Sequence, residues 1–362
     1  MHASATRALK IPHTFAENDL EGCGVCFSGR KLQIWHHARI GSDIMKALES
    51  STKDKIYALR EAIGVTIKGK QETIQLAIVA LLAEGHLLIE DVPGVGKTTL
   101  GHALARSLDC DFHRIQFTSD LLPSDVLGVS VYSPKLNEFQ FKPGPIFANV
   151  VLADEINRTT PKTQSALLEA MNESQVTIEN MTYPLPRPFM VLATQNPIEH
   201  HGTYPLPESQ LDRFLMRIEM GYPDPAAEKE ILKRFSNGNY KRKTEAVVTR
   251  EEVRQLQDES RKIHIDEPIV DYMIQIVNRT RQHSEIELGV SPRGTAALFR
   301  AAQSSAMLEG RSFVIPDDVK KLMHPVFEHR LVMGRGSARG RAVTLDARTV
   351  LAEIISQTPI PA

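Results

Sequence analysis

The chain has 362 residues, of which 42% are hydrophobic and 24% charged, the composition of a globular protein long enough for two domains. Its 43 Lys and Arg residues balance 44 Asp and Glu residues, and the net charge of −1 argues against a protein that mainly coats nucleic acid. Three cysteines exclude a disulfide framework, and no apolar run has the length of a membrane span or, near the N-terminus, of a secretion signal. We therefore expect a cytoplasmic protein without membrane insertion.

Residues 1–44 lack the regular hydrophobic spacing of the rest of the chain, and we expect them to form a disordered or irregular extension. Because the regular pattern begins at Met45, we hypothesise that translation starts there; a native peptide containing Trp35 in mass spectrometry would refute this. Residues of the kind that bind zinc occur in the extension, but without the strand and turn pattern that surrounds such sites: Cys23, Cys26, His36 and His37.

The next part of the chain alternates between helices and short apolar strands. Residues 73–83 predict a buried helix that ends near Gly85, and residues 86–90 predict a parallel strand. Further strands are expected at residues 112–117, 150–153, 189–194 and 216–220. Further helices are expected at residues 97–108 and 160–171, and a β-hairpin at residues 175–185. Short strands separated by helices predict a parallel sheet with helices on both faces.

After residues 222–225 the strand pattern stops and only helices are predicted. Asp224 and Pro225 begin the first of them, and Thr249 with Glu252 forms a capping box for the next. Later helices are expected at residues 268–283, 292–309, 316–330 and 346–356. The predicted fold is therefore α/β, with a three-layer αβα domain at residues 45–221 and an all-α domain at residues 222–362.

A phosphate-binding loop is the strongest signal, and it lies between a predicted strand and a predicted helix. Gly94 and Gly96 allow backbone N–H groups to point at an anion, and the helix that follows adds its own free N–H groups. Lys97 is expected to contact the β- and γ-phosphates and Thr98 to bind Mg²⁺. The usual pattern has glycine at position 91, and we give the departure at Asp91 little weight. The predicted nucleotide-binding residues are Pro93, Gly94, Val95, Gly96, Lys97, Thr98 and Thr99.

Polar residues follow two of the predicted strands at the same edge of the sheet. Asp154 is expected to support Mg²⁺ through water, and Glu155 to act as the base that polarises the attacking water. Asn196 is expected to orient this water or to contact the γ-phosphate. A solvated acidic turn and an Asn-Pro turn are the structural alternatives at the two places.

Two arginines complete the predicted site. Arg293 lies in the first turn of a predicted helix, where a cation opposes the helix dipole at a cost of about 0.3–1 kcal/mol. Such a misfit indicates that the charge serves another purpose, such as contact with a phosphate. Arg213 follows an acidic and polar stretch before an apolar strand. An exposed arginine without a role is the simpler alternative for both residues.

Five sequence blocks resemble the MoxR family of AAA+ ATPases, and the resemblance extends from Met45 to Pro361. It implies a P-loop domain with a helical lid, and a nucleotide bound between them at the subunit interfaces of a ring, usually a hexamer. The blocks are Gly144-Pro-Ile-Phe-Ala148, Leu152-Ala-Asp-Glu-Ile-Asn-Arg158, Ala193-Thr-Gln-Asn-Pro197, Gly202-Thr-Tyr-Pro-Leu-Pro207 and Leu211-Asp-Arg-Phe214.

The resemblance also implies a role for each candidate residue, with ATP and Mg²⁺ as cofactors. The loop at residues 94–98 corresponds to Walker A, and Asp154 with Glu155 to Walker B. Asn196 corresponds to sensor 1 and Arg293 to sensor 2. Arg213 corresponds to the arginine finger, which completes the site of the neighbouring subunit and is worth about 10³–10⁵ in rate where measured.

Four further segments have an expected structure or position. The resemblance implies a helical insert at residues 127–140 and a pre-sensor hairpin at residues 175–185, both facing the pore or substrate. His200 and His201 stand where the family has Gln-Glu, and we expect them in a solvent-facing loop rather than at a metal. The Gly/Arg-rich residues 334–341 are similar to an RNA-binding tract, but they lack aromatic residues and we expect a flexible loop.

The resulting prediction is an ATP-hydrolysing machine that remodels or matures a protein client. The resemblance also implies a partner with a von Willebrand A domain. The alternatives are a nucleic-acid-directed AAA+ motor, a slow nucleotide-gated adaptor and a small-molecule kinase. The neutral charge and the absence of a DNA-binding domain argue against the motor, and Arg213 and Arg293 favour a ring ATPase over a kinase.

Overall fold

The structure, a computed structural model, describes residues 52–92, 94–196, 203–236, 245–334 and 346–361. These residues belong to one compact unit. Several predictions concern residues outside the described ranges: the N-terminal extension with its zinc-type residues, Met45, Pro93, His200, His201 and the Gly/Arg-rich segment after Gly334.

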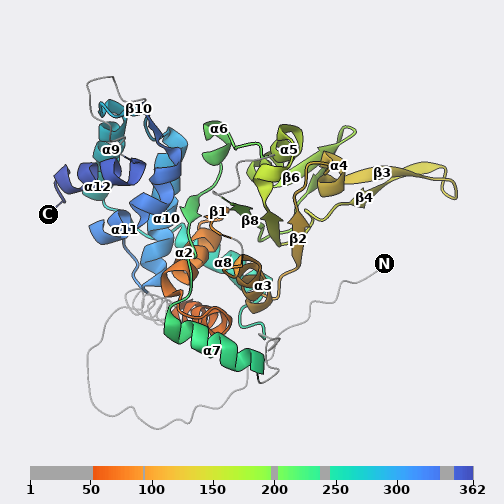
Figure 1. The fold of residues 1–362 in the computed structure, drawn as a ribbon, viewed down its shortest axis with the longest axis horizontal. Helices are drawn as coiled ribbons and strands as arrows, with labels where there is room; N and C mark the ends of the chain where they lie inside the picture. The colour runs from red at the N-terminus through yellow and green to blue at the C-terminus, as the bar shows by residue number, and fades with distance from the viewer. Residues whose placement is uncertain (1–51, 93, 197–202, 237–244, 335–345, 362) are drawn as a thin grey trace, which may run out of the picture. The chain divides into compact units, whose positions relative to one another are not determined.

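Five parallel strands form the central sheet in the order β2–β5–β8–β1–β9 (Figure 1). β5 is buried along its whole length, because helices cover both faces of the sheet. This arrangement confirms the predicted parallel sheet. The strands are β1 (Leu87–Glu90), β2 (Phe112–Gln116), β5 (Val150–Asp154), β8 (Met190–Gln195) and β9 (Met216–Ile218).

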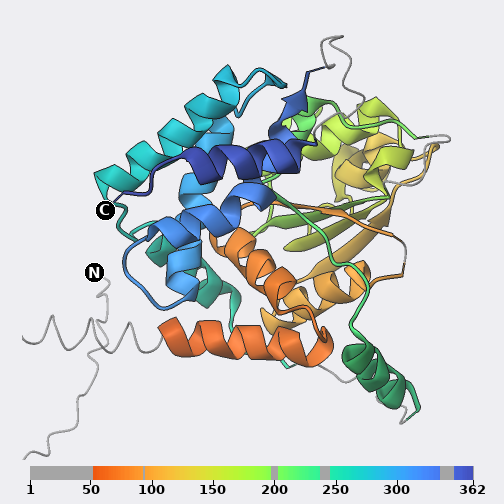
Figure 2. The same ribbon diagram turned by 60° about the vertical axis from the view of Figure 1, so that its left-hand side comes forward.

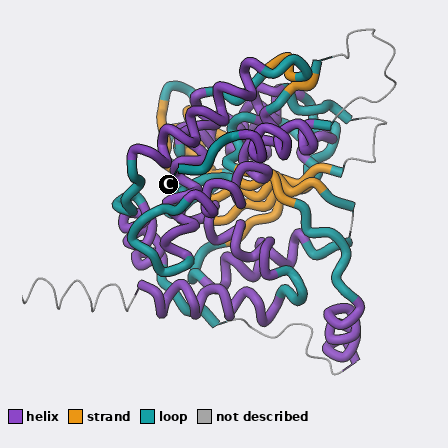
Figure 3. The backbone as a smooth tube through the Cα atoms, turned by 90° about the vertical axis from the view of Figure 1, so that its left-hand side faces the viewer, coloured by secondary structure: helices purple, strands orange, loops and turns teal. Residues whose placement is uncertain are grey.

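Alternate strand residues enter two separate hydrophobic clusters, since successive side chains of a strand point to opposite faces. Val150 and Leu152 share a cluster with α2 and α3, whereas Val151 and Ala153 share the other with α5. Figure 3 shows the strands between groups of helices. Residues 52–66 are helical, and the helices that follow are α2 (Gln71–Leu82), α3 (Lys97–Ser107), α4 (Pro123–Leu127), η1 (Ile156–Arg158), α5 (Pro161–Glu173) and α6 (Glu208–Leu211).

The helical insert expected at residues 127–140 is wrong, because this segment is mostly a β-hairpin. β3 (Gly128–Ser133) pairs antiparallel with β4 (Glu138–Pro143). The β-branched and aromatic residues of the two strands favour extended pairing, and Gly128, with φ of 106°, lies so close to the Lys142 carbonyl that a Cβ would meet it at 2.4 Å.

The hairpin predicted at residues 175–185 is confirmed. β6 (Gln175–Ile178) pairs antiparallel with β7 (Met181–Pro184). Glu179 and Asn180 connect them with positive φ angles of 48° and 71°, as a tight hairpin turn requires. The two hairpins meet where the Phe141 and Tyr183 rings stack at 4.1 Å between centroids.

The described chain after β9 is mainly helical, as predicted. α2 packs against α8 and α10 (Figure 2), and a single hydrophobic cluster continues from this face of the sheet into the later helices. The division at residues 221 and 222 remains a prediction. The elements are α7 (Pro225–Ser236), α8 (Arg250–Ser260), α9 (Glu267–Gln282), β10 (Ile286–Leu288), α10 (Pro292–Leu308), α11 (Pro316–Phe327), η3 (Glu328–Arg330), β11 (Val332–Met333) and α12 (Ala347–Gln357).

Candidate nucleotide site

The predicted phosphate loop connects β1 to α3. Gly94 and Gly96 have φ angles of 87° and 100°, a left-handed conformation that disfavours residues with a side chain. A Cβ at Gly94 would meet nothing within 4 Å, so this part of the loop faces open space. The Lys97 ammonium lies over the loop and donates to the Asp91 carbonyl at 2.9 Å. The loop, the lysine and the first turn of α3, which includes Thr98 and Thr99, therefore fit a phosphate group.

Asp91, to which the sequence analysis gave little weight, holds three backbone N–H groups. Its buried carboxylate accepts hydrogen bonds from Val92 at 2.8 Å, Met220 at 2.7 Å and Gly221 at 2.5 Å. Met220 and Gly221 lie in the connection from β9 to α7. Asp91, which stands in place of the usual glycine, thus connects the phosphate loop by hydrogen bonds to the segment that leads into the later helices.

The carboxylate of Asp154 lies at the carboxyl end of β5 and is held on both oxygens. Oδ1 accepts from the Thr194 hydroxyl at 2.6 Å, and Oδ2 accepts from Arg114 Nε at 3.0 Å and Nη2 at 2.6 Å. Thr194 also accepts the Glu155 backbone N–H at 2.9 Å. Neither Thr194 nor Arg114 was predicted from the sequence. The signal for Thr194 was a hydroxyl in an otherwise apolar strand, next to the strand that carries the acidic pair.

Glu155 has a left-handed backbone, with φ of 58° and ψ of 50°, which costs about 1–3 kcal/mol for a residue other than glycine. Its Oε2 accepts from Gln116 Nε2 at 2.8 Å and pairs with Arg158 Nε at 3.2 Å. Gln116 lies on β2 in register with Asp154, so the neighbouring strand reaches both acidic residues. Strain that is held by specific partners is typical of functional sites.

Asn196 directly follows β8 and is buried. β8 lies between β5 and β1, and the Asp91 N–H donates to the Gln195 carbonyl at 3.2 Å. Three adjacent parallel strands therefore end at the acidic pair, at Asn196 and at the phosphate loop. The sheet topology brings these predicted residues to one edge, where ligands of α/β folds commonly bind.

The two predicted arginines both contact α5. Arg213 is half-buried, and its Nη1 donates to the Leu168 carbonyl at 3.0 Å. Arg293 is exposed, and its Nη2 donates to Asn172 Oδ1 at 2.5 Å. Neither hydrogen bond reaches the phosphate loop. The described contacts thus place both arginines beside the sheet domain without joining them to Lys97.

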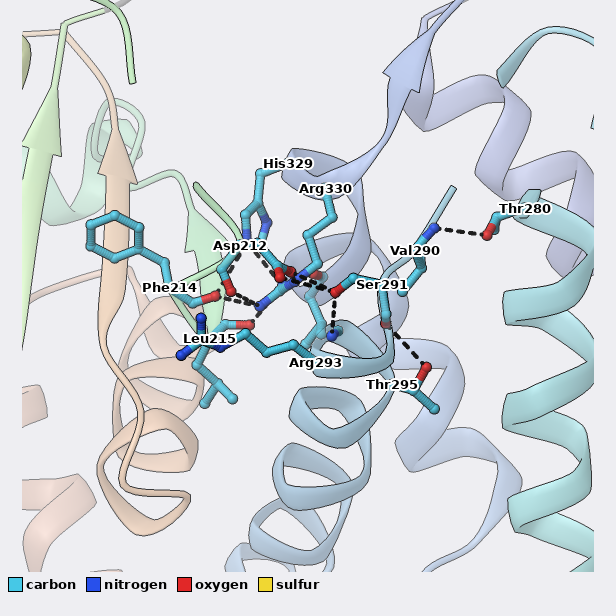
Figure 4. A network of polar contacts seen from close by, with 12 residues as sticks. Asp212, Phe214, Leu215, Thr280, Val290, Ser291, Arg293, Thr295, His329 and Arg330 are labelled. Carbon is cyan, nitrogen blue, oxygen red and sulfur yellow. Dashed lines mark hydrogen bonds and ion pairs between the residues drawn. The ribbon is translucent and has the colours of Figure 1, made fainter. Parts of the chain in front are cut away.

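Asp212, next to Arg213, is the centre of a polar network that the sequence analysis missed (Figure 4). Its carboxylate accepts from Ser291 Oγ at 3.0 Å and from Arg330 Nε at 2.8 Å. Burial lowers the pKa of Arg330 to about 10, although the charge of Asp212 opposes this shift. The guanidinium therefore remains charged at neutral pH. Burial and the charges of Arg330 and Arg217 also hold the pKa of His329 well below its usual value.

Comparison with known proteins identifies the family. One family model, the ATPase family associated with various cellular activities (AAA), matches residues 86–216, and the AAA lid domain matches residues 278–353. The chaperone MoxR1 of Mycobacterium tuberculosis is 42% identical over 276 residues, which cover 74% of this chain and 73% of that protein. This chain belongs to the MoxR family of AAA+ ATPases.

Two further proteins support the same family and fold. YeaC of Bacillus subtilis, an uncharacterised protein, is 49% identical over 301 residues, covering 83% of this chain and 93% of YeaC. A solved protein of Cytophaga hutchinsonii, provisionally described as an ATPase, has a TM-score of 0.82 and 37% identity, covering 89% of this chain and 100% of that one. The fold of this MoxR-family protein is thus the P-loop αβα architecture with a helical lid.

The described residues lack two further features. They contain no helix with the length and apolar character needed to cross a membrane. They also contain no cluster of three or more His, Cys, Asp or Glu residues suited to a metal ion. The buried carboxylate of Asp154 and the Thr98 hydroxyl fit Mg²⁺, since this ion commonly takes most of its ligands from phosphate and water.

Proposed function

We propose that this MoxR-family protein hydrolyses ATP and uses the cycle to remodel or mature a protein client. The observation that carries the proposal is the strand edge at which the phosphate loop, Asp154, Glu155 and Asn196 meet. The relative named as a chaperone supports the protein client. No observation on the described residues favours the nucleic-acid motor or the adaptor.

The phosphate loop would bind ATP through its backbone N–H groups and Lys97. To contact the β- and γ-phosphates, the Lys97 ammonium would give up its hydrogen bond with the Asp91 carbonyl. Thr98 and Asp154 would hold Mg²⁺, which when bound neutralises phosphate charge. The full nucleotide-binding set is Pro93, Gly94, Val95, Gly96, Lys97, Thr98 and Thr99.

Glu155 is the proposed general base, and Asn196 orients the same water. In the present arrangement the Glu155 carboxylate is held by Gln116 and Arg158. Both contacts engage Oε2 and fix the direction of the carboxylate, so we propose that they restrain hydrolysis until the side chain turns towards the attacking water.

The proposed assembly is a ring, with a hexamer as the expected form. Arg293 would sense the nucleotide from the lid, and Arg213 would complete the site of the neighbouring subunit. Arg213 would then leave the Leu168 carbonyl, to which it is bonded within its own chain. We further propose a partner with a von Willebrand A domain and a cytoplasmic location, both from the family resemblance.

The test is phosphate release from ATP with Mg²⁺ by the full chain. We expect Lys97→Ala to lose ATP binding, and Glu155→Gln to bind ATP but hydrolyse it at least 10²-fold more slowly, the scale of a lost general base. A Glu155→Gln rate equal to that of the wild type would disprove the proposed chemistry. Because this variant would keep ATP bound, it also serves to capture the client for identification.

A further inference from the structure

The turn that contains Arg213 is held by hydrogen bonds from the lid of the same chain. Phe214 is fully buried in one hydrophobic cluster, and Leu215 packs into the other. On the lid side, Arg330 donates to the backbone carbonyls of Phe214 at 2.5 Å and Leu215 at 3.1 Å. The backbone is therefore fixed immediately after Arg213.

Asp212 fixes the turn on the other side of Arg213. Its carboxylate pairs with Arg330, whose side chain is only 2% exposed. A buried guanidinium needs its partner, because removing one member of such a pair leaves an uncompensated charge. Figure 4 shows Ser291 and Arg330, both from the lid, converging on this single carboxylate.

Ser291 links the same carboxylate to the lid helix that carries Arg293. Its hydroxyl donates to Asp212 and accepts the Gly294 N–H at 3.0 Å as the N-cap of α10. Gly294 packs closely on Arg330, since a Cβ there would lie 2.8 Å from Arg330 Cδ. The start of α10 therefore cannot shift by much without disturbing the hold on Asp212.

We infer that Asp212 is a positioning residue that couples the lid of one subunit to the direction in which Arg213 points. Arg293 comes two residues after Ser291, and Arg213 comes one residue after Asp212. The contact between the Ser291 hydroxyl and the Asp212 carboxylate therefore connects the two chain segments that carry these arginines. Movement of the lid pulls on the Arg213 turn. The state of the nucleotide in one subunit thereby controls the arginine offered to the next. This inference rests on the proposed function.

The first test is the steady-state ATPase rate of Ser291→Ala in the full chain. This variant removes the link to α10 but keeps the Asp212–Arg330 pair. We expect kcat to fall about tenfold with KM for ATP changed less than about twofold, since a small misplacement of a transition-state group costs up to about 10²-fold. Thr249→Ala is the matched control, because Thr249 also caps a helix, α8, through its hydroxyl, and its described side-chain hydrogen bonds are to Glu252.

The second test separates positioning of Arg213 from loss of structure. In a ring that mixes Ser291→Ala and Glu155→Gln subunits, some sites take Glu155 from a Ser291→Ala subunit. The neighbouring Glu155→Gln subunit supplies Arg213 to such a site and keeps the Ser291–Asp212 contact. We expect ATPase activity to recover in the mixture, as for Arg213→Ala mixed with Glu155→Gln. No recovery would mean that Ser291 acts only within its own subunit, and would overturn the inference.

Asp212→Asn is an independent variant, and we expect it to show the same fall in kcat and the same recovery of ATPase activity in mixed rings. If it fails to fold, shown by circular dichroism and a lowered Tm, Ser291→Ala still decides the question. If Arg213→Ala keeps the wild-type rate, the proposed role of Arg213 fails and the inference fails with it. If Arg213→Ala loses turnover while Ser291→Ala and Asp212→Asn keep it, only the inference fails.

Discussion

Arg114 holds Asp154 through two nitrogen atoms, at 3.0 and 2.6 Å from the same carboxylate oxygen. Arg114 lies on β2 and Asp154 at the end of β5, two neighbouring parallel strands. The proposed ligand of Mg²⁺ is therefore already paired with a cation. Any metal ion at this place must compete with the guanidinium for Asp154.

This competition predicts the Mg²⁺ dependence of an Arg114→Gln variant. We expect the Mg²⁺ concentration for half-maximal ATPase activity to fall about threefold, because the carboxylate is no longer shared; the effect is modest since Arg114 is half-exposed and screened by solvent. The control is Arg250→Gln, which breaks another partly exposed arginine–aspartate pair, with Asp111. An unchanged or raised Mg²⁺ requirement would contradict the prediction.

The contact between Gln116 and Glu155 predicts a faster enzyme when it is removed. We expect Gln116→Ala to raise the ATPase rate in the absence of a client by about threefold to tenfold, the size of one hydrogen bond of about 1 kcal/mol. Gln357→Ala is a matched control, because Gln357 donates to Glu353 at 2.9 Å on α12. A lower rate in Gln116→Ala would instead show that Gln116 assists the base.

The carboxylate of Asp91 predicts a stability cost at the phosphate loop. We expect Asp91→Ala to lower the free energy of unfolding by about 2 kcal/mol or more, because three N–H groups lose a charged acceptor. Urea unfolding measures this change, and hydrogen exchange at Met220 and Gly221 should rise with it. Asp346→Ala, at the exposed cap of α12, should cost less. Unchanged exchange at both amides would refute the linkage.

Because His86 is buried, we expect the free energy of unfolding to fall in acid. The ring accepts the Val191 N–H on Nδ1 at 3.0 Å and lies 3.0 Å from the Met171 carbonyl through Nε2, and burial lowers its pKa from 6.5 to about 4. Because the unfolded chain binds the proton more tightly, this contribution to stability is full above pH 6.5. It falls by up to about 3 kcal/mol as the pH drops to 4.

Unfolding in urea between pH 7 and pH 4 measures this dependence. We expect His86→Phe to be less stable at neutral pH, because Val191 and Met171 lose their partner, but to show a shallower decline towards pH 4. His113→Phe, which changes an exposed histidine bonded to the Pro145 carbonyl, should keep the wild-type slope. Equal slopes for His86→Phe and the wild type would contradict the assignment.

Local patterns in the chain predicted most of the α/β core. The apolar strands that end at Asp154 and Thr194 are recognisable because burial on both faces demands continuous hydrophobic residues. The glycines before Lys97 are recognisable because their positive φ angles restrict the residue type. The helical insert predicted at residues 127–140 was wrong, since the expectation came from the family resemblance rather than from the alternating residues of the segment, most of which forms a hairpin.

The sequence alone was enough to predict most strands and helices of the α/β core, the phosphate loop and the acidic pair, since each depends on neighbours along the chain. The residues that hold these features in place are brought to them by tertiary contacts. Arg114 and Gln116 reach the acidic pair across a strand pairing, and Asp91 reaches Gly221 across 130 residues. Asp212 meets Ser291 and Arg330 only after the lid has packed. Such contacts depend on sheet order and helix packing, and they leave no periodic signal in the chain.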